Sequence, residues 1–144
     1  MKIDLIKALG REIGAREAQR SGPKREAHAL AVKLRAELAE AVSLFVRTTV
    51  SEGADHMDVI AVGPVEPDDK SVRAFQIRIT RGRYLAFVVT KDRGEVMLVG
   101  PFKRGEPEGP CHAIHLDEGP QAAAELEHSV ELLLVRLIEQ AFGK

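Results

Sequence analysis

Residues 72–102 read VRAFQIRITRGRYLAFVVTKDRGEVMLVGPF, and this stretch decides the fold. It contains three runs rich in β-branched and aromatic residues, the composition that is typical of strands. Two four-residue segments separate the runs, residues 79–82 and 91–94, and each ends in glycine. This spacing is typical of a type I turn closed by a glycine in the left-handed region. We therefore expect a three-stranded antiparallel meander.

The two turns predict a register for the strands. The first turn would place Ile77 opposite Leu85, and the second would place Phe87 opposite Val99. Because side chains alternate between the faces of a sheet, one face then collects an apolar set for the helices to cover: Phe75, Ile77, Ile79, Leu85, Phe87, Val89, Met97 and Val99. The other face is mixed: Gln76, Arg78, Thr80, Tyr84, Ala86, Val88, Thr90, Val96, Leu98 and Phe102.

Helical patterns flank the meander on both sides. Residues 2–20 carry apolar side chains at helical spacing, and Ser21-Gly22-Pro23 is expected to end this helix. Residues 24–51 carry the longest apolar stripe, at Ala27, Ala31, Leu34, Leu38, Ala41, Phe45 and Thr48. The regularity of this stripe is typical of a helical hairpin with residues 2–20, of a dimer seam or of ordinary core packing. We expect the helical hairpin, over residues 2–51. A last helix is expected over residues 120–142.

Two further strands complete the predicted antiparallel sheet, which spans residues 56–117. Residues 56–65 alternate like a strand, and residues 111–117 are a candidate fifth strand. The predicted order is α-α-β-β-β-β-(β)-α. Helices at both ends of a meander give an α+β two-layer domain, with the helices on one face of the sheet. At 144 residues, a single domain over residues 1–144 is expected.

The composition is typical of a soluble cytoplasmic protein. Hydrophobic residues make up 44% and charged residues 30% of the chain, which is ordinary for a globular domain. No apolar run approaches the roughly 18 residues that a membrane span needs, and the first residues do not resemble a signal peptide. Cys111 is the only cysteine, so no internal disulfide can form and a reducing compartment is expected.

Charge is distributed in blocks. Residues 71–104 carry a net charge of +6, between −5 for residues 51–70 and −6 for residues 105–144. In a meander, the first turn lies at the same sheet edge as the end of the third strand. We therefore expect one basic edge formed by Arg78, Arg81, Arg83, Tyr84, Lys103 and Arg104. Such an edge either neutralises its acidic neighbours or binds an anionic ligand, a nucleic acid or an acidic peptide. A pI near 6.5 and the absence of tryptophan argue against a nucleic acid.

Residues 111–117, CHAIHLD, resemble a catalytic or metal site at first sight. Strand alternation would place Cys111, His115 and Asp117 on one face. A structural zinc site, however, normally takes paired ligands from two segments, and no second ligand pair is present. A cysteine nucleophile would depend on His115 as its base. We expect no metal, no cofactor and no catalytic residue, and an enzyme that uses this strand is the weakest interpretation.

The mixed sheet face leads to the functional prediction. This face is too apolar to be covered by water alone, so a helix or a second subunit must cover it. We predict a non-enzymatic interaction module that forms a homodimer, with Val88, Val96, Leu98 and Phe102 in the interface. The alternative is binding of an anionic ligand at the basic edge.

Overall fold

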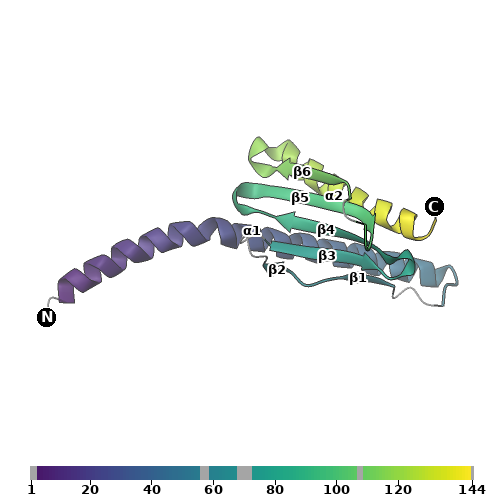
Figure 1. Cartoon of the computed structure of the whole chain (residues 1–144), viewed down its shortest axis with the longest axis horizontal. Coiled ribbons are helices and arrows are strands. Elements are labelled where there is room, and N and C mark those ends of the chain that lie inside the picture. The colour runs from purple at the N-terminus through teal and green to yellow at the C-terminus, as the bar shows by residue number, and fades with distance from the viewer. Residues whose placement is uncertain (1–2, 56–58, 68–72, 107–108, 144) are drawn as a thin grey trace.

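The computed structural model describes residues 3–55, 59–67, 73–106 and 109–143 (Figure 1). Its two α-helices are α1 (Ile3–Ser51) and α2 (Pro120–Ala141). Its strands are β1 (Ile60–Val62), β2 (Glu66–Pro67), β3 (Arg73–Ile79), β4 (Tyr84–Thr90), β5 (Glu95–Lys103) and β6 (Cys111–His115). Short 3-10 turns follow three of these strands: η1 (Arg81–Arg83), η2 (Asp92–Gly94) and η3 (Leu116–Glu118).

The strands form one antiparallel sheet in the order β1-β3-β4-β5-β6, with β2 also beside β3. Both α-helices lie on the same face of this sheet (Figure 1). The predicted α+β two-layer fold is therefore confirmed, and residues 111–115 form the fifth strand of the main order. Part of the strand expected over residues 56–65 is present as β1, and residues 56–58 lie outside the described residues.

The predicted helical hairpin over residues 2–51 is wrong. α1 continues from Ile3 to Ser51 without a break, and the backbone of Pro23 lies inside it. A proline inside a helix removes one hydrogen bond and favours a kink, but it does not have to end the helix. On one side of Pro23 lie good helix formers, residues 15–20 (AREAQR). On the other side the helix is stabilised by packing on the sheet, so both parts remain helical.

The predicted register is wrong at the first turn. Ile79 pairs with Tyr84, so Ile77 lies opposite Ala86 and not opposite Leu85. The loop contains one more residue than expected, because Arg83 joins Gly82 in the left-handed region, with φ values of 60° and 74°. A shift of one residue moves every side chain of the next strand to the other face. The second turn is as predicted, with Phe87 opposite Val99.

This shift exchanges the two faces of β4, and those of β5 as far as Val99. A bulge between the Phe87–Val99 and Leu85–Phe102 pairs keeps Phe102 on the face away from the helices. The face under the helices carries Phe75, Ile77, Ile79, Ala86, Val88, Val96, Leu98 and Ile114, all buried. Val88, Val96 and Leu98 are 0%, 0% and 4% exposed, so the prediction that they lie on the uncovered face is wrong. They form the core with residues of both helices: Ala27, Ala31, Leu34, Leu38, Val42, Ala122, Leu126, Val130, Leu133, Leu134 and Leu137.

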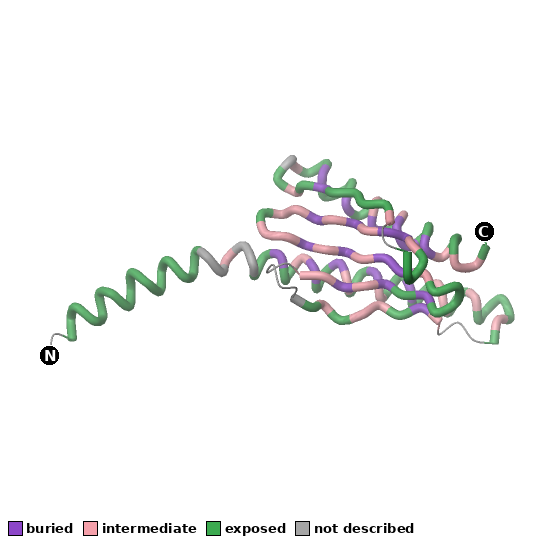
Figure 2. The backbone as a smooth tube through the Cα atoms, viewed as in Figure 1, coloured by how far each residue is buried: buried purple, intermediate pink, exposed green. Residues whose placement is uncertain are grey.

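A buried threonine fixes α1 to the sheet. Thr90 is fully buried, and its hydroxyl donates a hydrogen bond to the carbonyl oxygen of Ala27 at 2.7 Å. The same hydroxyl lies 3.3 Å from the carbonyl oxygen of Arg73. Among the α1 residues whose burial is described, Ala27 is the first that is buried. The preceding part of the helix, residues 3–26, is here called the N-terminal arm. It extends beyond the sheet into solvent (Figure 2).

The burial of Leu98 gives a direct test of the register. We expect Leu98→Ala to lower the free energy of unfolding by about 2–5 kcal/mol, because it leaves a cavity in the core. Leu44 is the control. It lies in α1 after the N-terminal arm, and its side chain is 59% exposed, so Leu44→Ala should change the free energy of unfolding by less than about 0.5 kcal/mol. Urea denaturation of both variants measures the difference. Equal effects would mean that Leu98 is not in the core.

The Thr90 hydroxyl gives a second stability test. Thr90→Val keeps the shape of the side chain but removes the hydrogen bond to the Ala27 carbonyl. We expect a loss of about 0.5–1.5 kcal/mol in the free energy of unfolding, the usual net value of one hydrogen bond. Urea denaturation measures this loss. An unchanged or raised stability would show that this hydrogen bond does not help to hold α1 on the sheet.

Candidate functional site

A basic cavity lies where β3 ends and β4 begins. Its volume is about 260 Å³, and its lining consists of Arg78, Ile79, Thr80, Arg83, Tyr84, Leu85 and Arg104. The chain that follows β5 closes this site, because the backbone N–H of Arg104 donates to the carbonyl oxygen of Arg83 at 2.7 Å. Four of the six residues predicted for the basic edge are therefore brought together.

The cations of the basic cavity have no acidic partner among the described residues. No described carboxylate lies within 4.0 Å of the side-chain nitrogens of Arg78, Arg83 or Arg104. All three arginines are exposed, while Ile79 and Leu85 are buried beside them. Guanidinium groups bind carboxylate and phosphate oxygens in a bidentate manner. The cavity therefore has the chemistry to bind an anion with an apolar part.

The remaining two residues of the predicted edge lie outside the cavity lining. The guanidinium of Arg81 lies over the ring of Phe142, 4.9 Å from its centroid, a cation–π contact that joins the first turn to the end of α2. Lys103 is exposed, and its backbone N–H contacts the Glu106 carboxylate at 3.4 Å. Neither side chain can be assigned to the anion site on this geometry.

The residues of the 111–117 segment do not form a catalytic group. Cys111 and His115 both lie on the face away from the helices, but they are four residue steps apart along the strand, about 13 Å. Asp117 has left the strand and lies in η3. A thiol and an imidazole at this separation cannot exchange a proton directly. Among the described residues, no group of three or more His, Cys, Asp or Glu side chains is placed to hold a metal ion.

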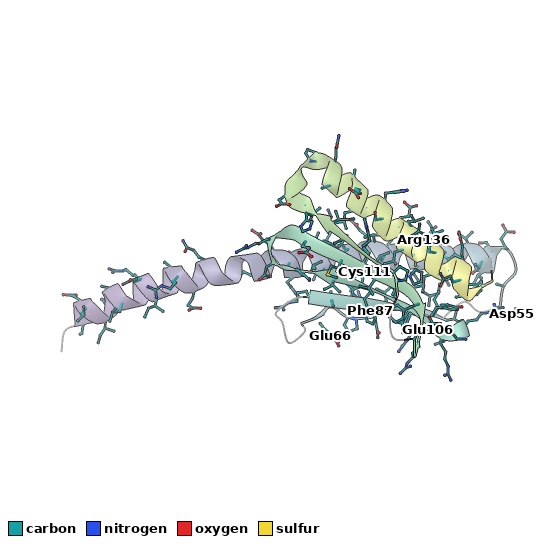
Figure 3. All side chains as sticks on the ribbon, turned by 45° about the horizontal axis from the view of Figure 1, so that its top comes forward. Asp55, Glu66, Phe87, Glu106, Cys111 and Arg136 are labelled. Carbon is teal, nitrogen blue, oxygen red and sulfur yellow. The ribbon has the colours of Figure 1, made fainter. Side chains whose placement is uncertain are left out.

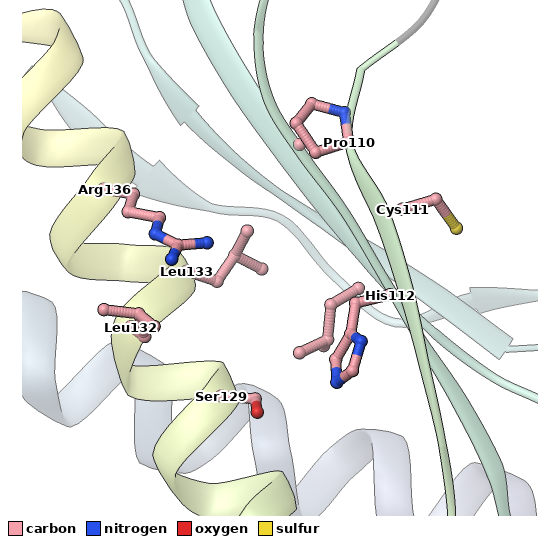
Figure 4. Close-up of a pocket in the computed structure, with 9 residues that line it drawn as sticks. Pro110, Cys111, His112, Ser129, Leu132, Leu133 and Arg136 are labelled. Atoms are coloured by element: carbon pink, nitrogen blue, oxygen red, sulfur yellow. The ribbon is translucent and has the colours of Figure 1, made fainter.

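A second cavity, which the sequence did not predict, lies between β6 and α2 (Figure 4). It has a volume of about 310 Å³ and contains His112, Ser129 and Arg136 in its lining. His112 points toward α2 (Figure 4), and its Nε2 lies 3.7 Å from the carboxylate of Glu125. No hydrogen bond joins His112 to Ser129 in the described part of the chain. A local sequence pattern cannot reveal this cavity, because β6 and α2 meet only in the folded chain.

The face of the sheet away from the helices is largely apolar. We call its part in β4 and β5 the open sheet face, which comprises the buried Leu85 and the half-buried Phe87, Val89, Met97, Val99 and Phe102. Gln76 and Arg78 of β3 lie beside it on the same face. None of these side chains belongs to the core under the helices. The rings of Phe87 and Phe102 stack with their centroids 5.9 Å apart, and no described helix covers them (Figure 1). Of the four predicted interface residues, only Phe102 lies on this face.

The N-terminal arm carries a second uncovered apolar surface. Every side chain of residues 3–19 is exposed, and Figure 3 shows the arm extending away from the rest of the chain. Five large apolar side chains lie on it, with 48–60% of their surface exposed: Ile3, Leu5, Ile6, Leu9 and Ile13. We call these five residues the arm stripe. The sequence predicted the helical spacing of this stripe but not that it projects from the fold.

No family model matches this chain, and neither a curated protein nor a solved structure is significantly similar to it. Among the described residues, no helix is both long enough and apolar enough to cross a bilayer.

Proposed function

We propose that the protein is a non-enzymatic interaction module that forms a homodimer in the cytoplasm. The observation that carries this proposal is the arm stripe, five large apolar side chains that are about half exposed on a stretch of helix that is exposed throughout residues 3–19. Such side chains are unfavourable in water and are typical of an interaction surface. The single free and exposed Cys111 is compatible with a reducing compartment.

The size of the apolar surface supports association. Full burial of an Ile or Leu side chain stabilises by about 1.5–3 kcal/mol. Five side chains that are about half exposed would therefore contribute about 4–7 kcal/mol for each arm. A symmetric dimer buries two arms, for about 8–15 kcal/mol, against an association cost of about 4–15 kcal/mol. The arms alone are therefore on the scale that a dimer requires.

The open sheet face supplies a second contribution. Phe87, Val89, Met97 and Val99 replace the buried Val88, Val96 and Leu98 of the predicted interface, and Phe102 is retained. Antiparallel sheets that face water usually alternate apolar and polar residues along each strand. β4 and β5 are apolar on both faces in their centres. This composition favours a partner layer over water.

Charge reversal in the arm stripe tests the proposal. The double variant Ile6→Glu with Leu9→Glu should convert a dimer into a 15.8 kDa monomer, because four carboxylates per dimer cannot be buried without partners. Ala8→Glu with Ala15→Glu adds the same charge on the opposite side of the arm and should leave the dimer intact. Light scattering after size-exclusion chromatography gives the masses. A wild-type monomer at all concentrations would end the proposal of self-association.

The basic cavity supports a second candidate function, the binding of an anionic ligand. Three guanidinium groups without described carboxylate partners converge there beside Tyr84. One aromatic ring gives little base stacking, so this cavity favours an acidic peptide over a nucleic acid.

Salt dependence and substitution test the anion site. A fluorescent polyglutamate peptide should bind with an affinity that falls steeply between 50 and roughly 200 mM salt, because the cavity is open to screening ions. Arg83→Gln with Arg104→Gln should weaken binding about 10-fold or more, since each charge-assisted hydrogen bond contributes about 1.5–3 kcal/mol. Lys33→Gln with Arg47→Gln removes the same charge from exposed positions of α1 and serves as the control. Equal affinity for the two double variants would exclude the cavity.

A further inference from the structure

The arm stripe has the same helical phase as the buried side of α1. At 100° per residue, its mean direction lies within about 20° of the mean direction of Ala27, Ala31, Leu34, Leu38 and Val42. α1 is continuous from Ile3 to Ser51. The stripe therefore lies on the side of α1 that packs on the sheet, in a part of the helix that extends beyond the described strands (Figure 1).

The open sheet face is an apolar sheet surface that no described helix covers, whereas the arm stripe is an apolar helix surface that no described strand covers. The two surfaces also match in length. Residues 3–20 of the arm span about 26 Å at 1.5 Å per residue. The seven residues of β4 and the nine of β5 span about 23–30 Å. A helix with one apolar stripe, laid on an apolar sheet, is a standard packing of α+β domains.

We propose that two copies exchange their arms, so that the arm of each copy lies on the open sheet face of the other. This inference rests on the proposed self-association and names its surfaces. A two-fold axis can bury both surfaces at once if it lies in the plane of the sheet, runs perpendicular to α1 and passes near the boundary between the N-terminal arm and the rest of the chain. It places the second sheet end to end with the first, in the same layer. Each sheet is then covered by its own helices on one face and by the partner's arm on the other.

The required area is consistent with this exchange. A stable dimer interface buries about 1,600 Å² in total. A reciprocal exchange divides this area over two arms and two open sheet faces, so each of the four surfaces needs to bury only about 400 Å². The side of the arm away from the stripe carries Asp4, Lys7 and Arg11, all exposed, and these charges remain in water in the dimer.

Other positions for the arm fit less well. Pairing of the two arms with each other would use a stripe that stops at Ile13, before Arg16 and Glu17, and a coiled coil normally needs three to four heptads. A groove between α1 and α2, lined in part by Leu38, Val130 and Glu131, opens in the helix layer. Both alternatives would leave the open sheet face uncovered.

The single natural cysteine provides the test. Cys111 lies opposite Val99 in the sheet and is exposed, and Figure 4 shows its side chain pointing away from α2, on the side of the open sheet face. We would introduce a second thiol into the arm stripe, as Ile6→Cys or Ile13→Cys, and oxidise the otherwise wild-type protein mildly. The matched controls are Ala8→Cys and Ala15→Cys, on the opposite side of the arm. Non-reducing electrophoresis and peptide mass mapping identify the linked pairs.

The proposal predicts disulfides between the introduced thiol of one copy and Cys111 of the other, at least about 5-fold more abundant for the stripe positions than for the controls. A second variant, Met97→Glu, should dissociate the dimer while leaving the circular dichroism spectrum unchanged, because Met97 lies on the open sheet face and outside the core. Ser43→Glu, on the exposed side of α1, is its control.

The outcomes separate this inference from the proposed function. Disulfides between the two introduced thiols, with little linkage to Cys111, would show paired arms. A dimer that survives Met97→Glu and gives no linkage to Cys111 would place the arm elsewhere. Either result overturns the exchange but keeps self-association. A wild-type protein that is monomeric by mass at all concentrations overturns both.

Discussion

The four-residue turn between β3 and β4 decides which side chains the helices bury. Gly82 and Arg83 both adopt the left-handed conformation there, and Tyr84 is the first residue to pair with β3. Because side chains alternate along a strand, this one residue determines the direction of every side chain in β4, and through the next turn that of the β5 side chains as far as the bulge that precedes Phe102. Val88 and Leu98 thereby enter the core, while Phe87 and Met97 form the open sheet face. The composition of the open sheet face follows from this turn.

The sequence predicted the strands and the second turn but not this register. The two turns have the same glycine at the fourth position, and each places an arginine beside it in the left-handed region. What distinguishes the first turn is that Arg83 follows its glycine, whereas Arg93 precedes Gly94, and a non-glycine residue adopts this conformation only when the surrounding structure favours it. The pattern of β4 could not correct the error. Residues 85–89 read LAFVV, so both faces are apolar, and alternation cannot show which face the helices cover.

The basic edge was easier to predict than the register, because it depends on strand order. A meander brings the first turn and the end of the third strand to one edge whichever way the side chains point. Arg83 and Arg104 therefore meet as expected. The partner of Arg81 could not be foreseen, since Phe142 belongs to a helix that begins after the whole sheet. The prediction that a helix ends at Ser21-Gly22-Pro23 was wrong for a related reason. Packing on strands that are distant in the sequence stabilises the part of α1 that follows Pro23.

The ambiguous register and the uncovered surfaces have a common origin. A sheet with one face in water keeps that face polar, and alternation then fixes the register. The centres of β4 and β5 are apolar on both faces and lack this alternation. Continuous apolar runs of this kind are typical of strands that are buried on both faces. The chain supplies two helices for one face only. It also extends α1 past the sheet, with an apolar stripe in the phase of the buried side. An arm whose side chains are all exposed over residues 3–19 and a sheet face that no described helix covers are each unfavourable in a monomer, and the proposed two-fold contact would remove both costs.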